Sequence, residues 1–267
     1  MKAPGIIRTI PIETRIARAM VDGFPIVTRR SMRAAGMHRS AVARRIADGR
    51  LVELFPNVFL VGIREQHATS DVRIAAAVAM TGPRSALDGV SALHRLDCWN
   101  RHDGTIRVAT TSGSATKVVG VRFCRVRPEQ IRMQVVSGIP TRRALDALFV
   151  AARELTPHQL AFVIDRARYR RLMSLDDIEH ALVVSPGRPG SVVVRRGLEL
   201  VRGGSAGTKS RSEDTLLAEL IDLVGIPLVN VRGSAGLVGY EPDFCYQALR
   251  LIIEVDGDQH TDDPHQA

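Results

Sequence analysis

Three acidic residues near the end of the chain have a spacing that could bind a metal ion. Asp243 precedes a short aromatic segment, and Glu254 and Asp256 lie at the end of an apolar run that begins at Leu251. This run is too short for a helix and is bounded by a turn signal and a glycine, which indicates a buried strand. A four-residue connection joins the two segments, so we expect a hairpin that brings Asp243 and Glu254 to the same end. Glu254 and Asp256 are two residues apart and share one face of the strand.

Carboxylates held this close repel one another. Two unit charges about 4 Å apart cost roughly 1 kcal/mol in water and about 4 kcal/mol at an effective dielectric near 20. A divalent cation reverses the sign of that interaction, and Mg²⁺ is commonly bound by one or two carboxylates together with water and phosphate oxygens. Such an ion can activate water and stabilise charge on a scissile phosphodiester. The alternative is an ordinary hairpin with acidic residues on its solvated face, and the spacing alone leaves both interpretations open.

The same residues resemble a known family. Asp243 after Pro242, ten further residues, the run Glu254-Val255-Asp256-Gly257 and then His260 are similar to the PD-(D/E)xK nuclease superfamily, in its very-short-patch-repair-like endonuclease branch. The segment Ser210-Arg211-Ser212-Glu213-Asp214 and the apolar helix after it also resemble that branch. The resemblance implies Mg²⁺ ligands at Asp243 and Glu254, supporting acids at Glu213 and Asp256, and a phosphate or water contact from His260.

Two features depart from the pattern of that family. Asp256 stands where the motif has a Lys, as is common in this branch, so the resemblance does not assure a general base. The chain also stops at Ala267, where family members usually continue with a basic helix and further strands. A module of about 60 residues is marginal alone, and the sheet edge that the missing helix normally covers needs another cover. We therefore expect the module to pack on its own chain or to form a homodimer, and nuclease activity to be weak or absent.

Composition favours a soluble protein with a polyanionic partner. The 267 residues, 45% hydrophobic and 24% charged, are enough for two or three modules. The formal net charge is +9, and it is uneven: residues 1–50 hold eleven Lys or Arg and three acids, whereas residues 241–267 hold one Arg and seven acids. A basic end for phosphate and an acidic end for a cation suit a protein that acts on DNA, while solubility alone is the alternative.

The cysteines and the termini predict a cytoplasmic protein without a membrane segment. Cys98, Cys124 and Cys245 are odd in number and far apart, with no zinc-ligand spacing, so we interpret them as buried thiols in a reducing compartment. Residues 1–11 contain no apolar signal region, and no run of 18 apolar residues occurs.

The first 69 residues predict a winged helix-turn-helix. A short amphipathic helix is expected at 12–21, a second from the cap residue Thr28 to Ala35, and a third at 41–47 that opens at His38 or Ser40. A hairpin of 51–55 and 58–61 follows. Three short helices and a hairpin are typical of a winged helix-turn-helix, whose third helix enters the major groove.

The second and third of these helices concentrate positive charge. We assign phosphate contacts to Arg29, Arg30 and Arg50, and possible base contacts to Arg39, Ser40 and Arg44. A solvated helix face is the alternative, which the density of arginine on these two helices makes less favourable. The predicted DNA-binding set is Arg29, Arg30, Arg33, Arg39, Ser40, Arg44, Arg45 and Arg50.

This segment resembles a second family. The stretch from Gly36 to Val52, followed by Asn57-Val58-Phe59, is similar to the N-terminal domain of AbiEi-type antitoxins of abortive-infection, type IV toxin–antitoxin systems. The resemblance implies binding to operator DNA, repression of the protein's own operon and a toxin encoded nearby.

The segment 70–202 predicts an α+β middle domain. Helices are expected at 71–80, 85–96, 142–155, 157–169 and 174–183, and strands at 105–110 and 118–126. Arg166, Arg168, Arg170 and Arg171 form a basic patch that could touch DNA, although a solvated helix face explains it as well. The glycine-rich stretch at 203–209 predicts a flexible linker. It precedes the incomplete endonuclease-like domain, 210–267.

The expected fold is thus an α+β and α/β multidomain chain: a winged helix-turn-helix, a middle domain and a restriction-endonuclease-like domain. Two functions remain open. In the first, the protein is an antitoxin-like transcriptional regulator that binds DNA and carries a nuclease-type domain. In the second, it is a Mg²⁺-dependent DNA endonuclease that its winged helix directs to the substrate.

Overall fold

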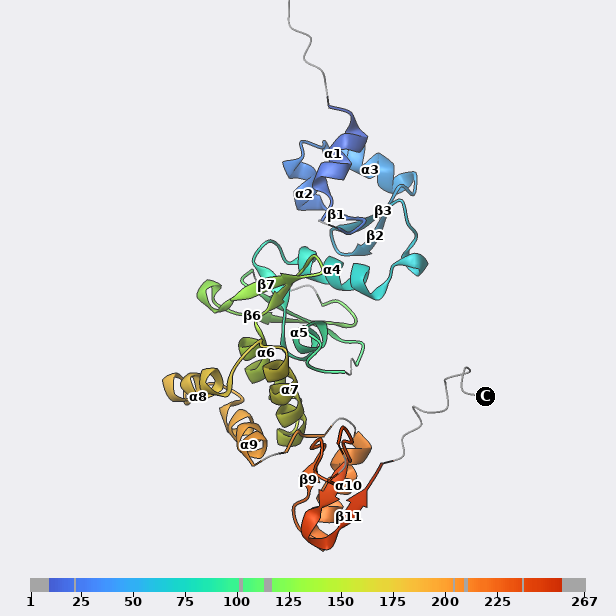
Figure 1. Cartoon of the computed structure of the whole chain (residues 1–267). Coiled ribbons are helices and arrows are strands. Elements are labelled where there is room, and N and C mark those ends of the chain that lie inside the picture. Colours follow the sequence, from blue (N-terminus) through green and yellow to red (C-terminus); the bar gives the residue numbers. More distant parts are fainter. Residues whose placement is uncertain are drawn as a thin grey trace, which may run out of the picture. The chain divides into compact units, whose positions relative to one another are not determined.

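The structure, a computed structural model, describes residues 10–21, 23–100, 103–112, 117–203, 205–208, 211–236 and 238–255. The chain divides into two compact units, Met1–Asp88 with Asp103–Arg142 and Gly89–His102 with Arg143–Ala267. Both combine helices with β-sheet, so the fold is a mixed α/β, multidomain one (Figure 1). The division runs through the expected 70–202 domain, because the strands of that segment complete a sheet in the first unit and most of its helices pack together in the second.

The first unit begins with three short helices and a three-stranded antiparallel sheet of order β1-β3-β2. Thr28 caps the second helix by accepting a hydrogen bond from Ser31 N at 2.9 Å, as the sequence predicts, and His38 Nδ1 accepts one from Ser40 N at the start of the third. The predicted helices and hairpin are confirmed, whereas β1 was not predicted. The elements are α1 (Ile12–Ala19), β1 (Ile26–Thr28), α2 (Arg29–Ala34), α3 (Arg39–Ala47), β2 (Leu51–Phe55) and β3 (Val58–Val61).

One apolar core holds these elements together. Each helix contributes a buried side chain, Ile16 from α1, Met32 from α2 and Val42 from α3, and all three belong to one apolar cluster with Leu51 and Phe59 of the sheet. Burying a side chain of this size contributes about 1.5–3 kcal/mol. The core therefore fixes the inner faces of α2 and α3 and leaves their outer faces to solvent.

A five-stranded mixed sheet of order β6-β5-β4-β8-β7 completes the first unit. The helix α4 (Ser70–Met80) contacts strands of both sheets. The predicted helix at 85–96 is wrong at its start, because residues 85–87 are a buried strand that pairs with β5 and β8. The strands are β4 (Ser85–Leu87), β5 (Ile106–Thr110), β6 (Val121–Arg125), β7 (Met133–Val136) and β8 (Ile139–Arg142), with 3₁₀ turns η1 (Glu65–His67) and η2 (Pro128–Gln130).

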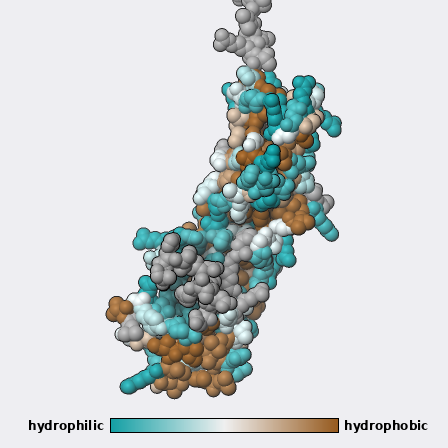
Figure 2. Space-filling model, turned by 90° about the vertical axis from the view of Figure 1, so that its right-hand side faces the viewer, coloured by the Kyte–Doolittle hydropathy of each residue, from teal (hydrophilic) through white to brown (hydrophobic). Residues whose placement is uncertain are grey.

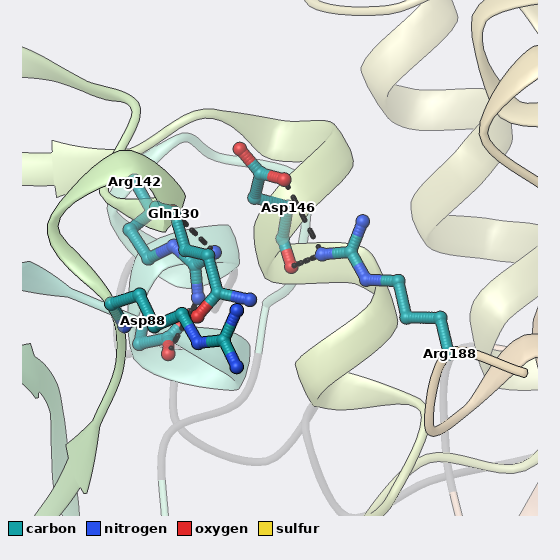
Figure 3. Close-up of polar contacts among 6 residues, drawn as sticks. Asp88, Gln130, Arg142, Asp146 and Arg188 are labelled. Atoms are coloured by element: carbon teal, nitrogen blue, oxygen red, sulfur yellow. Dashed lines mark hydrogen bonds and ion pairs between the residues drawn. The ribbon is translucent and has the colours of Figure 1, made fainter. Parts of the chain in front are cut away.

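A buried ion pair lies within this sheet unit (Figure 3). The Arg142 guanidinium donates to both carboxylate oxygens of Asp88 at 3.0 Å and to the Gln130 carbonyl oxygen at 3.0 Å. Both side chains of the pair are at least 96% buried. Removal of one partner would leave an uncompensated buried charge, so this pair belongs to the fold rather than to a binding surface.

The second unit contains a helical layer and a smaller C-terminal module. In the helical layer, α7 and α9 pack closely, because a Cβ added at Gly197 would lie 3.1 Å from Leu160 Cβ. Arg188 donates to Asp146 Oδ1 at 3.3 Å (Figure 3) and stands 4.1 Å over the Phe149 ring. The helices are α5 (Gly89–Arg95), α6 (Ala144–Ala151), α7 (Pro157–Tyr169), α8 (Leu175–Val184) and α9 (Ser191–Arg202).

The C-terminal module is one helix on a three-stranded antiparallel sheet of order β11-β10-β9. The predicted hairpin is confirmed, and Phe244 pairs with Ile253 across it. The expectation that its second strand is buried is wrong, because that strand forms the sheet edge and Leu251 and Ile252 are each 39% exposed. The elements are α10 (Arg211–Leu223), β9 (Leu228–Val229), β10 (Phe244–Tyr246), η3 (Gln247–Leu249) and β11 (Leu251–Ile253).

Apolar side chains are also exposed elsewhere on this module. Figure 2 shows brown, apolar residues gathered at the lower end of the view, the height at which the module lies in Figure 1. The exposed ones near the end of the helix and in the hairpin are Leu223, Val224, Ile226, Leu249, Leu251 and Ile252.

The described part of the expected linker is packed rather than flexible. A Cβ added at Gly207, whose φ is +79°, would lie 2.2 Å from the His158 carbonyl oxygen and 2.3 Å from Phe162 N. Thr208 is fully buried and donates to Asp214 Oδ1 at 2.5 Å, while Ala206 N donates to the β9 backbone. Glycine here permits a close backbone approach, so residues 205–208 fasten the module to α7.

Within the described part of the chain, no helix has the length and apolar character needed to cross a membrane.

Candidate functional site

Residues of α2, α3 and the turn between β2 and β3 line a basic groove of about 690 Å³. Within the described residues, the guanidinium groups of Arg33 and Arg39 make no hydrogen bond or ion pair, and both side chains are exposed. Among the residues that the structure describes, no acidic side chain lines the groove. The lining residues are Arg29, Arg33, Met37, His38, Arg39, Val42 and Asn57.

Local contacts fix the shape of the basic groove. Arg29 N donates to the Asn57 carbonyl oxygen at 2.9 Å, which ties the start of α2 to the hairpin turn. The Arg29 guanidinium stands 5.3 Å from the centre of the Phe59 ring, a cation–π contact. At the start of α3, the His38 ring lies 2.8 Å from the Ser40 hydroxyl. The starts of α2 and α3 thus bring Arg29 and Arg39 to one hollow beside the hairpin turn.

The structure separates the other predicted DNA-binding residues from this groove. Arg44 and Arg50 are exposed but do not line it. Arg30 lines a different, mostly apolar cavity of about 380 Å³, beside Gly82. Arg45 is 8% exposed and forms an ion pair with Glu13, so its charge holds α1 to α3. The inclusion of Arg45 in the predicted DNA-binding set is therefore not supported.

A second charged site lies at the open end of the β10–β11 hairpin. Asp243 Oδ2 accepts a hydrogen bond from Val255 N at 2.7 Å, and Glu254 Oε2 accepts one from Asp243 N at 3.3 Å. The Tyr240 hydroxyl also donates to Glu254. The predicted meeting of Asp243 and Glu254 is confirmed.

Glu213 joins these two residues from α10. It is 5% exposed, and its Oε2 accepts a hydrogen bond from Asn230 Nδ2 at 2.9 Å. Burial raises the pKa of Asp243, and the charges on Glu213 and Glu254 raise it further, against a lowering by the hydrogen bond from Val255 N. Glu213, Asp243 and Glu254 therefore interact electrostatically, and we call them the carboxylate cluster.

The carboxylate cluster fits a magnesium ion only as a site of few protein ligands. Among the described residues, no group of three or more potential ligands is placed to hold a metal ion. Glu213 is buried, whereas Asp243 is half-buried and Glu254 is exposed, which leaves Asp243 and Glu254 as the accessible oxygen donors. Mg²⁺ is commonly held by one or two carboxylates and by water, so these two residues suffice. Asp256 and His260, the other predicted site residues, lie outside the described residues.

Sequence reasoning missed two side chains at this site. Asn230 is 1% exposed and has a φ of +52°, and its amide donates to the carbonyl oxygen of Gly207 at 2.8 Å as well as to Glu213. Tyr240 bonds Glu254 across the hairpin end. Only the turn-forming character of Asn was a sequence signal, since it tolerates positive φ; nothing local indicated its partners.

Comparisons with known proteins add little to this geometry. No protein-family model and no curated protein matches the chain. Among solved structures, the chain is similar to the crystal structure of the RV2827C protein from Mycobacterium tuberculosis, with a TM-score of 0.41 and 20% sequence identity over 71% of this chain and 78% of that one.

Proposed function

We propose that the protein binds double-stranded DNA through the basic groove, with residues 1–69 acting as a winged helix-turn-helix. The observation that carries the proposal is the convergence of Arg29, Arg33 and Arg39 on one hollow whose described lining contains no acidic residue. Arg33 and Arg39 are exposed and have no hydrogen-bond or ion-pair partner among the described residues, so their charge is available for phosphate. Release of counterions then drives association. The order of α1, α2, α3 and the β2–β3 hairpin suits this class of domain.

In this proposal the two helices have different tasks. Arg29 and Arg33 on α2 contact phosphates, and the exposed side of α3, with Ser40 and Arg44, faces the base edges of the major groove. Arg39 lies at the start of α3, between the two. The biological role that we propose is antitoxin-like transcriptional regulation, which rests on the resemblance of residues 36–59 to AbiEi-type domains.

The test is binding of a short labelled duplex, taken from the region upstream of the protein's own gene, measured by fluorescence anisotropy. The variant Arg33→Ala/Arg39→Ala is expected to bind at least about tenfold more weakly. The matched control is Arg122→Ala/Arg125→Ala, which removes the same charge from exposed positions on β6. An equal loss of duplex affinity in both double variants would show that only the net charge matters and would contradict the proposal. Equal affinity for an unrelated duplex would contradict the regulatory role.

A second function, Mg²⁺-dependent endonuclease activity, is favoured by the interaction of Asp243 with Glu213 and Glu254. Asp243 and Glu254 would hold the ion, which would supply an activated water and charge stabilisation at a phosphodiester. Tyr240 and Val255 N orient the two carboxylates through their hydrogen bonds, and Asn230 orients Glu213.

Two readouts test this second function. Mg²⁺ in excess of its dissociation constant is expected to raise the melting temperature of the wild type and not that of Asp243→Asn, since an ion that binds only the folded state stabilises it. Supercoiled plasmid is expected to be nicked by the wild type and not by Asp243→Asn or Glu254→Gln. Stabilisation by Mg²⁺ without nicking would support a cation site and contradict endonuclease activity. The absence of both effects would contradict the cation site and the activity alike.

A further inference from the structure

A second groove, of about 540 Å³, lies within the second unit, along one face of α7. Its size is within the range of small-ligand sites. Phe162, Asp165, Arg166 and Tyr169 line it at the three- and four-residue spacing of a helix face. The opposite wall comes from the segment around β9. We call it the α7 groove; its other lining residues are Arg168, Val201, Ser205, Ala206, Asn230, Val231, Arg232 and Glu241.

Asn230, one of the residues that line the α7 groove, has an unsatisfied acceptor. Both amide hydrogens of Asn230 are used, by the Gly207 carbonyl oxygen at 2.8 Å and by Glu213 Oε2 at 2.9 Å, so the orientation of the amide is fixed. Its Oδ1 is buried and has no hydrogen-bond partner within the described part of the chain. A buried acceptor without a partner costs about 1–3 kcal/mol, which a ligand that carries a donor would recover.

An exposed aromatic side chain, Tyr169, lines the α7 groove together with three arginines. Tyr169 is 82% exposed, although large aromatic side chains usually bury their area. Arg168 lies 3.6 Å from Asp165 and Arg232 lies 3.8 Å from Glu241, and all four side chains are at least 30% exposed. Exposed ion pairs of this kind contribute little to stability, so phosphate can replace the acidic partners. Arg166 is engaged, since its Nε donates to the Asp97 carbonyl oxygen at 3.3 Å.

We propose that the α7 groove binds single-stranded nucleic acid through one nucleoside phosphate unit. The Tyr169 ring stacks on a base, Arg168 and Arg232 contact the backbone phosphates, and Asn230 Oδ1 accepts a hydrogen bond from the base or sugar. Stacking on an exposed aromatic ring beside a positively charged groove is the usual way in which proteins hold a single strand without reading its sequence. This site is separate from the basic groove and does not rest on the function proposed for it.

The α7 groove lies next to the carboxylate cluster. Asn230 contacts Glu213 through its side chain, and its backbone N donates to the Asp243 carbonyl oxygen at 3.0 Å. A strand that reaches Asn230 therefore lies beside these carboxylates.

The experiment uses the full chain and a fluorescein-labelled oligothymidylate of about 12 nucleotides. Anisotropy is measured in the Arg33→Ala/Arg39→Ala background, so that the basic groove does not contribute. Tyr169→Ala is expected to weaken binding about tenfold, whereas Tyr169→Phe keeps the ring and stays within about twofold. Arg168→Ala/Arg232→Ala is expected to lower both the affinity and its salt dependence, and the control Arg195→Ala/Arg196→Ala, exposed on α9, to leave them unchanged.

An internal reporter separates binding at the α7 groove from binding elsewhere. Trp99 is the only tryptophan of the chain, and its ring lies 6.0 Å from that of Phe162, which lines the groove. Oligothymidylate is expected to change Trp99 emission in the wild type and not in Tyr169→Ala. Unchanged affinity in Tyr169→Ala would overturn the proposal. Equal affinity for free thymidine monophosphate would overturn it too, in favour of a mononucleotide site.

Discussion

The basic groove and the carboxylate cluster carry opposite charges and differ in how the chain treats those charges. In the basic groove, Arg33 and Arg39 are exposed and make no hydrogen bond or ion pair with the described residues. In the carboxylate cluster, each acid accepts a hydrogen bond from a neighbouring group, and Glu213 is nearly buried. The exposed arginines are therefore free to bind a partner, whereas the hydrogen bonds of the acids already serve the fold.

The ion pair of Asp88 with Arg142 is almost completely buried. Breaking it is the largest loss of stability that we predict. Asp88→Asn leaves the buried guanidinium without its counter-charge, so the free energy of unfolding should fall by about 3–5 kcal/mol in chemical denaturation. The matched control is Asp97→Asn, whose partner Arg170 is exposed, and the expected loss there is below about 1 kcal/mol. Equal losses would contradict the distinction between held and presented charges.

The backbone around Gly207 anchors the carboxylate cluster, and a methyl group there should disturb it. Gly207→Ala forces a Cβ against the His158 carbonyl oxygen at positive φ, so a loss of about 2–4 kcal/mol is expected in thermal unfolding. Gly203→Ala, where a Cβ meets nothing closer than 3.4 Å, is the control and should be nearly neutral. A neutral Gly207→Ala would show that residues 205–208 are the flexible linker that their composition suggests.

Arg39 and Arg45 both lie on α3, but Arg39 is exposed in the basic groove and Arg45 is buried in an ion pair with Glu13. Substituting each in turn compares an exposed with a buried arginine on one helix. Arg39→Met should weaken duplex binding about tenfold, because it removes an exposed cation from the basic groove. Arg45→Met keeps most of the packing and removes only the pairing with Glu13, so duplex affinity should stay within about twofold. Anisotropy with one duplex measures both, and a larger loss for Arg45→Met would return that residue to the DNA surface.

The smallest effect concerns the ionisation of Asp243. Its pKa lies above the ordinary value of 3.8, chiefly through burial and then through Glu213 and Glu254. Its protonated form therefore favours the folded state, and this contribution is present below 3.8 and is lost as pH rises through the raised pKa. Asp243→Asn removes that loss, so its stability relative to the wild type should increase with pH, by less than about 1 kcal/mol after screening by solvent. Melting curves of both proteins, recorded without divalent cations from pH 3.8 upwards through the raised pKa, would show this increase. A stability difference that does not change with pH would contradict it.

Local signals in the sequence predicted a large part of the fold. The cap at Thr28, the glycine after α3 and the turn at Asn57 are short-range features, and they place the first three helices and the hairpin correctly. The β10–β11 hairpin was found in the same way, from two short runs and the connection between them. Strands β4, β7 and β8 were missed because each is only three or four residues long, and a short apolar run does not distinguish strand from helix.

The candidate sites were less predictable, because their decisive contacts join distant residues. Arg45 falls between Val42 and Ile46 on the inner side of α3, a signal that could have been used, but its partner Glu13 is 32 positions away. The packing of Gly207 against α7 and the engagement of Asn230 with Glu213 have no local pattern at all. Composition indicated a linker there, and tertiary packing overrode it.

The most direct test of the central claim, that exposed arginines of α2 and α3 bind duplex DNA, is the salt dependence of that binding. Each phosphate neutralised contributes about 0.9 to the slope of log affinity against log salt concentration. Arg33→Ala/Arg39→Ala should therefore reduce the slope by at least about 0.9, the contribution of the phosphate contact assigned to Arg33, while Arg122→Ala/Arg125→Ala leaves it unchanged. A slope that is the same in the wild type and in Arg33→Ala/Arg39→Ala would show that neither arginine contacts a phosphate and would contradict the account.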